Sequence, residues 1–304
     1  MGIGDTVDGH PLLRAEADTA LAELARSEQR PYYDADADRA ASAAYYGDVP
    51  PEQLGDLVRR THARTPTYKP AREVYPWVDL QPDRKIRSIY TGHVWEPAEL
   101  IRADLAVAEA RADVLKVRLS IDPLKATARA EVAAALEAQV EAALPYNCEH
   151  VVPQSWFGKK EPMRGDLHHL FACESRCNSF RNNTPYMEFA DYPAAPSGGP
   201  AITVVRADCG KSERNGFEPS QGRGPAARAV FYFLLRYPGL VQDAEMPPER
   251  RAMVLAWHEN DPVTEWERHR NAAIHERQGN RNPFIDRPEL AASLLPTLAT
   301  SIAA

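Results

Sequence analysis

The residues whose types and spacing could do chemistry lie in the middle of the chain, within residues 146–183. Glu149 and His150 are adjacent in a short apolar segment, residues 148–152, which Pro153 ends and which we predict to be a strand. Neighbouring side chains on a strand point to opposite faces. Both residues can therefore serve one site only where a ligand approaches the end of the strand or where the strand twists.

A polar helix that begins near Cys173 is predicted to supply the remaining groups. Asn178 shares one face of this helix with Arg181 and Asn182, because residues three and four positions apart are neighbours on a helix. Carboxylate and amide oxygens suit a hard cation such as Mg²⁺, and a neutral histidine can accept a proton from water. The pattern indicates a metal-assisted site, and the alternative is a solvated Glu–His pair beside a polar helix.

Composition excludes several classes of protein. The 304 residues are 44% hydrophobic and 26% charged, which is typical of a globular protein. No apolar run approaches the roughly 20 residues that span a membrane, so no membrane partner is expected. Residues 1–20 carry five acids or bases and no apolar core of a signal peptide, which favours a cytoplasmic chain. The net charge of −7 is concentrated in residues 1–50, so nucleic acid stays open as a partner.

The elements that must position these residues predict an α+β fold, mostly helical and formed by a single domain. Residues 1–66 read as a helical, acidic extension, peripheral to a domain of residues 67–304. Within the chain we expect extended structure over 68–83. Strands are predicted at 85–90, 148–152 and 202–206. Helices are predicted around the apolar stripe of residues 12–24 and before Pro31, at 50–62, from 97 onward, at 127–143, at 225–237 and within 251–277.

Three consecutive motifs then resemble those of the endonuclease I family. They are Cys-Glu-His-Val-Val-Pro-Gln-Ser (148–155), Met-Arg-Gly-Asp-Leu-His-His-Leu (163–170) and Cys-Asn-Ser-Phe-Arg-Asn-Asn (177–183). Further matches lie at 89–92, 223–228 and 278–286, so the resemblance covers roughly residues 68–290. The family consists of nonspecific nucleases built around a ββα-metal, or His-Me finger, core. The resemblance therefore implies this core.

The resemblance also implies roles for individual residues. His150 would be the general base, while Glu149 and Asn178 would be the protein ligands of one divalent cation, Mg²⁺. Arg181 would lie near the scissile phosphate, with helix capping or pairing to an acid as the alternative. Supporting, structural roles are expected for two residues of the second motif, Asp166 and His168.

Basic residues are expected to contact phosphates. Some relatives carry an arginine in an extended loop after the Glu-His pair, and it has no clear equivalent here. Lys159, Lys160 or Arg164 could take its place. Arg223 and Arg228 open an apolar helix, where we expect phosphate contacts; salt bridges to Glu218 or Asp208 are the alternative. Arg164 also stands where some relatives have an acid.

The four cysteines of the chain all lie around this region. Cys148 precedes Glu149, Cys177 precedes Asn178, and Cys173 and Cys177 share a helical face. Together with Cys209 they suggest a structural Zn²⁺ site. Two disulfides, or buried free thiols, are the alternatives.

The resemblance as a whole implies hydrolysis of DNA, and of RNA as a further substrate, with little sequence preference. Two rivals are a catalytically silent nucleic-acid-binding protein and a zinc-dependent structural protein on the same fold. Family members are often secreted or periplasmic, which conflicts with the cytoplasmic expectation; a dedicated inhibitor protein would resolve the conflict. The sequence predicts neither the oligomeric state nor the role of residues 1–66.

Overall fold

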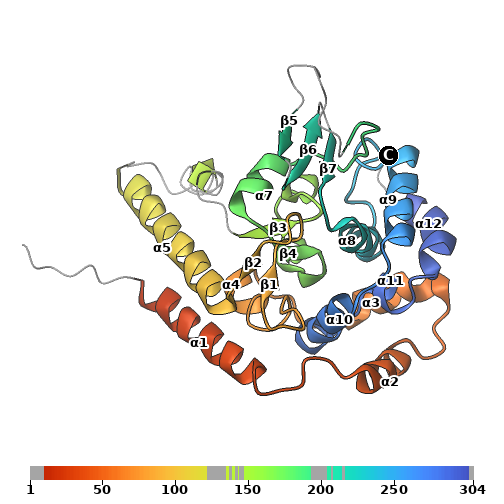
Figure 1. Cartoon of the computed structure of the whole chain (residues 1–304), viewed down its shortest axis with the longest axis horizontal. Helices are drawn as coiled ribbons and strands as arrows, with labels where there is room; N and C mark the ends of the chain where they lie inside the picture. The colour runs from red at the N-terminus through yellow and green to blue at the C-terminus, as the bar shows by residue number, and fades with distance from the viewer. Residues whose placement is uncertain are drawn as a thin grey trace, which may run out of the picture.

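The computed structural model of the chain (Figure 1) describes residues 10–121, 147–192, 208–213 and 216–300, together with 135–136, 139–140, 143 and 204–206. Most of the fold is helical. Its helices are α1 (Pro11–Ser27), α2 (Ala35–Tyr46), α3 (Leu54–Thr61), α4 (Pro70–Glu73), α5 (Pro97–Ile121), α7 (Ser175–Arg181), α8 (Arg223–Arg236), α9 (Pro248–Asn260), α10 (Glu265–Gln278), α11 (Pro283–Asp286) and α12 (Leu290–Thr300).

The strands form three small antiparallel sheets. One pairs β1 (Ile86–Arg87) with β2 (Val94–Trp95), one pairs β3 (Cys148–His150) with β4 (Leu170–Ala172), and one contains β5 (Val204–Arg206), β6 (Gly210–Glu213) and β7 (Gly216–Pro219). The 3₁₀ turn η1 (Pro51–Gln53) precedes α3, and η2 (Gln154–Phe157), η3 (Met163–Gly165) and η4 (Leu167–His169) lie between β3 and β4. The mixed, mostly helical α+β class is therefore confirmed.

Helix α8 is the centre of the larger hydrophobic core. The side chains of its aromatic run, including Phe231 and Phe233, are fully buried. Helices α9 and α3 and the turn η4 pack around α8, so the apolar residues predicted at 225–237 form the core helix as expected. Because η4 leads directly into β4, this core also holds one strand of the β3–β4 hairpin.

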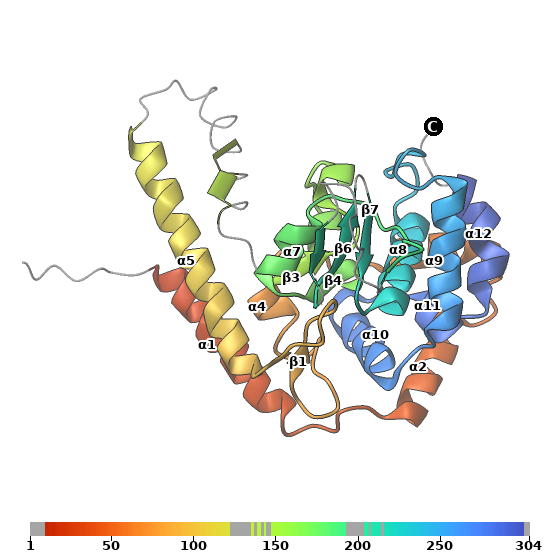
Figure 2. The ribbon, with the colours of Figure 1, turned by 45° about the horizontal axis from the view of Figure 1, so that its top comes forward.

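The N-terminal segment wraps around the rest of the molecule. Helix α1 lies beside α5 at one side (Figure 2). Helix α3 packs against α8. Leu54, Leu57 and Val58 of α3 are buried in the main core, so this part of the segment is integral to the fold and not peripheral as expected. A domain boundary at residue 66 stays a prediction.

Two local predictions differ from the structure. Residues 68–83 are not simply extended, because Pro70 starts the short helix α4, where a first-turn proline is tolerated. The strand expected over 85–90 shortens to the two residues of β1. The predicted helix at 127–143 falls almost wholly outside the described residues, and β5 is the described part of the strand predicted at 202–206.

Candidate active site

A strand hairpin and one helix carry the candidate site. Strands β3 and β4 pair so that Glu149 lies opposite Phe171 and His150 opposite Leu170. Helix α7 packs against β3. The Asn178 side chain of α7 donates a hydrogen bond from Nδ2 to the carbonyl oxygen of Cys148 (2.8 Å). This hydrogen bond places Asn178 beside the strand that carries Glu149 and His150.

Glu149 is only 1% exposed and is held through one of its two carboxylate oxygens. Oε1 accepts hydrogen bonds from Arg181 and from the Tyr90 hydroxyl (3.0 Å), and Tyr90 in turn contacts the hydroxyl of Tyr186 (2.7 Å). Burial raises the pKa of Glu149, while Arg181 and Tyr90 oppose that shift by stabilising the carboxylate. Among the described residues, no side chain or backbone group donates to Oε2.

His150 is fixed by the backbone of η3. Its Nε2 lies 2.9 Å from the carbonyl oxygen of Arg164, and because a carbonyl only accepts, Nε2 carries the proton of the neutral ring. Nδ1 then holds the lone pair. Burial lowers the pKa of His150 well below its usual range, so the ring is neutral near pH 7. The ring of Tyr68 packs 4.7 Å from that of His150.

Arg181 does not reach the surface, and this corrects its predicted place at a phosphate. It is 1% exposed, and its Nη1 and Nη2 atoms donate to the carbonyls of His150 and Val151 (2.8 Å each), besides the Glu149 contact. Its Nε donates to Thr184 (3.2 Å). A guanidinium with these partners holds β3 and Glu149 in place. The alternative weighed from sequence, pairing to an acid, is what the structure has.

Asp166 and His168 lie in a polar cluster beneath the hairpin. Asp166 Oδ2 accepts from the hydroxyls of Tyr232 and Tyr237 (2.8 Å each), and its Oδ1 accepts from Gln278 (3.1 Å). Burial lowers the pKa of His168 to about 3, and its ring packs 4.2 Å from that of Tyr232. These contacts tie the turn η4 to α8 and α10.

Sequence reasoning missed several residues at the site. His169 donates from Nε2 to the Met163 carbonyl (2.6 Å), and its ring lies 5.4 Å from that of His150. Tyr68 and Tyr90, which contact His150 and Glu149, had no assigned role, although Tyr90 lies inside a matched motif. The motif was the available signal for Tyr90; for Tyr68 there was none, because its contact depends on chain folding.

A second buried ion pair, also missed, holds the other strand of the hairpin. Arg270 donates from Nε to Asp79 Oδ1 (2.7 Å) and from Nη2 to the carbonyls of Leu167 (2.9 Å) and Leu170. Asp79 Oδ2 accepts from the backbone of Ala172 (2.8 Å). We call this pair the β4 clamp, and Glu149 with Arg181 the β3 clamp.

The predicted phosphate contacts fall into two groups. Lys159 and Lys160 are exposed on the loop between the strands, and the guanidinium of Arg164 lies 5.2 Å over the Tyr68 ring, next to His150. Arg223 and Arg228 instead make salt bridges. Arg223 pairs with Glu218 (2.5 Å), as the alternative held. Arg228 is buried and pairs through two donors with Glu267 (2.6 and 2.9 Å), so its predicted phosphate contact is wrong.

The cysteines form neither a zinc site nor two disulfides. Cys177 and Cys209 are joined by a disulfide (Cα–Cα 5.3 Å), whereas Cys148 and Cys173 are buried free thiols. Disulfide sulfurs are not thiolate ligands, so the four-cysteine Zn²⁺ site is excluded. The disulfide connects α7, which carries Asn178, to the turn before β6.

The donors at the hairpin suit a metal held by few protein ligands. Within the described ranges no three or more His, Cys, Asp or Glu side chains are arranged to enclose a metal ion. Glu149 Oε2 and Asn178 Oδ1 are oxygen atoms left over by the contacts described above. Mg²⁺ retains several waters and is commonly bound through one or two carboxylates plus substrate phosphates, so this small oxygen set fits it.

Comparison with known proteins identifies the family of the chain. The chain matches the Endonuclease I family over residues 86–289 and belongs to that family. It is 33% identical over 167 residues to an extracellular ribonuclease of Bacillus subtilis (strain 168), covering 50% of this chain and 54% of that protein.

Two proteins of Aeromonas hydrophila are also similar. An extracellular deoxyribonuclease is 31% identical over 170 residues (49% of this chain, 68% of that protein), and a periplasmic deoxyribonuclease is 31% identical over 160 residues (46% and 62%). The chain spans about half the length of the first curated relatives that it matches.

The comparisons give no support to the cytoplasmic location expected from the sequence, since these relatives are named as extracellular or periplasmic. In the part of the chain that the structure describes, no helix has both the length and the apolar character needed to cross a bilayer.

Proposed function

We propose that this protein is a Mg²⁺-dependent endonuclease in which His150 activates water, and Glu149 and Asn178 hold one metal ion. The observation that carries the proposal is the hydrogen bond from Asn178 Nδ2 to the Cys148 carbonyl (2.8 Å). It orients the amide so that its oxygen, not its nitrogen, is left over beside the strand that carries Glu149 and His150. Family membership supports the nuclease class.

The chain's own residues would act in a defined order. His150 Nδ1 would accept a proton from water, because Nε2 is already bound to the Arg164 carbonyl. The water oxygen would then bond to phosphorus as the bond from phosphorus to the 3′ oxygen breaks. A bound Mg²⁺ would polarise the phosphate and stabilise the leaving 3′ oxygen. Arg181 and Tyr90 would keep Glu149 in position without touching substrate.

Arg164 is our candidate for the cation that neutralises the phosphate. Its carbonyl binds His150, and its guanidinium lies over Tyr68, whose ring packs against His150. A guanidinium suits a phosphate because its donors form a fork. The exposed Lys159 and Lys160 on the same loop would contact the backbone of the nucleic acid farther from the scissile bond.

We propose DNA as a substrate and RNA as a second one, with little sequence preference. The relatives include proteins named ribonuclease and deoxyribonuclease, and a mechanism directed at the phosphodiester bond serves both polymers. Export or secretion of this protein is proposed on the same basis.

The test is cleavage of supercoiled plasmid and of single-stranded RNA by the full chain, with Mg²⁺ and with EDTA. We expect nicking only with metal. His150→Ala should reduce cleavage about 100- to 10,000-fold, the contribution of a general base, while duplex binding in EDTA is retained. His93→Ala, which changes an exposed histidine, is the matched control and should cleave normally.

Asn178→Ala should raise the Mg²⁺ concentration needed for half-maximal cleavage, and an unchanged metal titration would remove it from the ligand set. If wild-type protein binds nucleic acid but yields no product in any metal, the silent-binder alternative holds instead. Undiminished cleavage by His150→Ala would reject the assigned base while leaving the nuclease class intact.

A further inference from the structure

A polar cavity with a volume of about 590 Å³ lies between α2, α10 and the end of α11, away from the candidate active site. Three arginines line it: Arg39 from α2, Arg268 from α10 and Arg287 just after α11. Two aspartates, Asp38 and Asp286, also contribute to its wall.

Both aspartates are already fully occupied by other groups. Arg281, which is buried, donates to Asp38 (2.7 Å) and through two atoms to Asp286 (2.7 and 2.8 Å). Their remaining oxygen contacts come from the hydroxyls of Tyr33 and Tyr46 (2.8 Å each). These carboxylates are therefore poor partners for the arginines that line the cavity.

Two of the lining arginines lack an acidic partner. Within the described part of the chain, no carboxylate pairs with Arg268 or Arg287. Arg287 lies over the Tyr46 ring (4.4 Å), a contact that uses the face of the guanidinium, and among the described residues no hydrogen bond takes up its N–H donors. Arg39 pairs only with exposed Asp36, and exposed pairs of this kind are weak.

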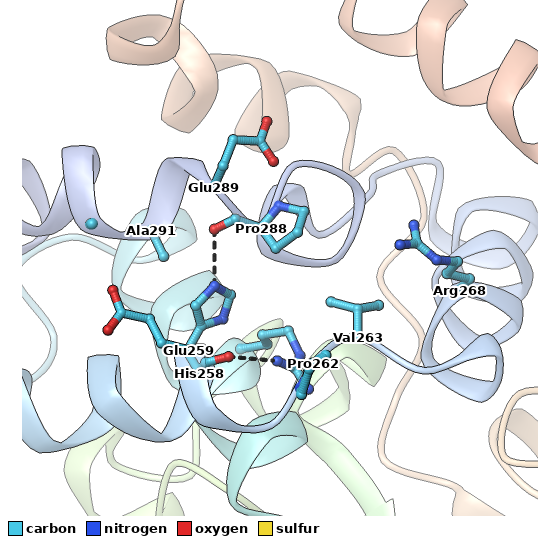
Figure 3. Close-up of a pocket in the computed structure, with 10 residues that line it drawn as sticks. His258, Glu259, Pro262, Val263, Arg268, Pro288, Glu289 and Ala291 are labelled. Atoms are coloured by element: carbon cyan, nitrogen blue, oxygen red, sulfur yellow. Dashed lines mark hydrogen bonds between the residues drawn. The ribbon is translucent and has the colours of Figure 1, made fainter.

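The neighbouring cavity has a different character. Figure 3 shows Arg268 on one side of it, with Glu259 and Glu289 on the other. In the same view His258 donates to the Pro288 carbonyl (2.9 Å). Its acids are not occupied by a buried arginine, so the excess of positive charge is particular to the cavity of Arg39, Arg268 and Arg287.

We propose that this cavity, here called the arginine pocket, binds a phosphate group. The positive charges of three arginines that line one space repel one another, and a dianion placed between them would remove that repulsion while accepting their N–H donors. Ser42, which also lines the pocket, adds a hydroxyl donor. The proposal does not depend on the catalytic assignments above.

The arginine pocket is separate from the catalytic hairpin. Arg268 and Arg270 are two positions apart on α10 and so point to nearly opposite faces of the helix. Arg270 contacts the β4 strand, whereas Arg268 lines the pocket. The phosphate could come from the backbone of a bound nucleic acid or from a free phosphate compound, and the experiment separates these sources.

The test measures binding to the full chain in EDTA, where no cleavage is expected. Inorganic phosphate is titrated by calorimetry, and a fluorescent 20-base-pair duplex is titrated by anisotropy at several salt concentrations. The variants are Arg268→Gln, Arg287→Gln and their combination; Arg14→Gln, an exposed arginine on α1, is the control. Melting temperatures establish whether each variant is folded. If the double variant does not fold, the two single variants are enough to test the proposal.

We expect saturable phosphate binding that weakens about tenfold for each arginine removed, as charge-assisted hydrogen bonds predict. If duplex affinity and its salt dependence fall as well, the phosphate belongs to a nucleic acid backbone. If only phosphate binding falls, the ligand is a free phosphate compound. Absence of saturable phosphate binding, or equal binding by the double variant, would overturn the proposal, even with a change in duplex affinity.

Discussion

The β3 clamp and the β4 clamp are both buried ion pairs, but their carboxylates are used differently. Each joins a buried carboxylate to a buried arginine, and each arginine also binds strand carbonyls and lies over an aromatic ring, Tyr186 for Arg181 (4.5 Å) and Phe171 for Arg270 (3.9 Å). In the β4 clamp both oxygens of Asp79 are bound. In the β3 clamp one oxygen of Glu149 carries both contacts.

This difference separates a structural ion pair from a candidate functional one. Burial, partner type and distance are nearly alike in the two clamps, so none of them marks the site. The distinguishing property is the oxygen that the protein does not use. A metal ion needs a carboxylate oxygen that no protein group already binds, and the structural ion pair of Asp79 with Arg270 leaves none.

The largest effect should come from Glu149→Gln. The change keeps the shape of the side chain but removes the charge that would attract a cation, so we expect Mg²⁺-dependent cleavage to fall about 1,000-fold, corresponding to several kcal/mol. Plasmid nicking rates, measured beside circular dichroism, test this. Asp79→Asn is the comparison: its activity per folded molecule should change far less.

Asp79→Ala should produce the largest loss of stability. It leaves Arg270 buried without its acid, which typically destabilises a protein by about 3–5 kcal/mol. Chemical denaturation measures the free energy of unfolding. Asp83→Ala, which breaks an exposed pair with Arg87, is the control and should lower it by less than about 1 kcal/mol. Equal losses in the two variants would show that the β4 clamp does not stabilise the fold.

Cys177→Ser tests a connection that only the β3 side has. The disulfide to Cys209 spans a sequence separation of 32 residues and restrains α7, which carries Asn178 and Arg181. Loop-closure entropy predicts a loss of about 3–4 kcal/mol in unfolding free energy. Melting in the presence and absence of a reductant measures it. Cys173→Ser removes a free thiol and keeps the disulfide, so it should lose stability with the reductant as the wild type does, whereas Cys177→Ser should be insensitive to the reductant.

The smallest effect concerns the approach to β3. Asp104 accepts from the backbone of Asn147 (3.1 Å), and burial raises its pKa from 3.8 to about 7. Because the folded pKa lies above the unfolded one, protonated Asp104 contributes stability below about pH 4, and that contribution is lost as the pH rises toward 7.

Asp104→Asn should therefore raise the melting temperature by a few degrees at pH 8 and leave it nearly unchanged at pH 4. Differential scanning calorimetry across this range is the measurement. A variant that is less stable than the wild type at pH 8 would contradict the assignment of a raised pKa.

The sequence grouped the candidate site residues more readily than the residues that support them. Glu149, His150 and Asn178 lie within 30 residues and inside quoted motifs, so local spacing and resemblance sufficed to group them. Asp79 and Arg270 are 191 residues apart, and no periodicity connects such a pair. The sequence singled out Arg181 but did not predict its ion pair with Glu149, because an arginine suits a phosphate and a carboxylate equally well.

The β4 clamp also bears on the order in which the chain is made. The residues of the hairpin are synthesised at the midpoint of the chain, yet Asp79 has no counter-ion until α10 has left the ribosome. Chains that stop before residue 265 would carry Glu149, His150 and Asn178 on a hairpin with an unpaired buried acid beneath it. The β4 strand therefore gains this buried ion pair only when nearly all of the sequence has been translated.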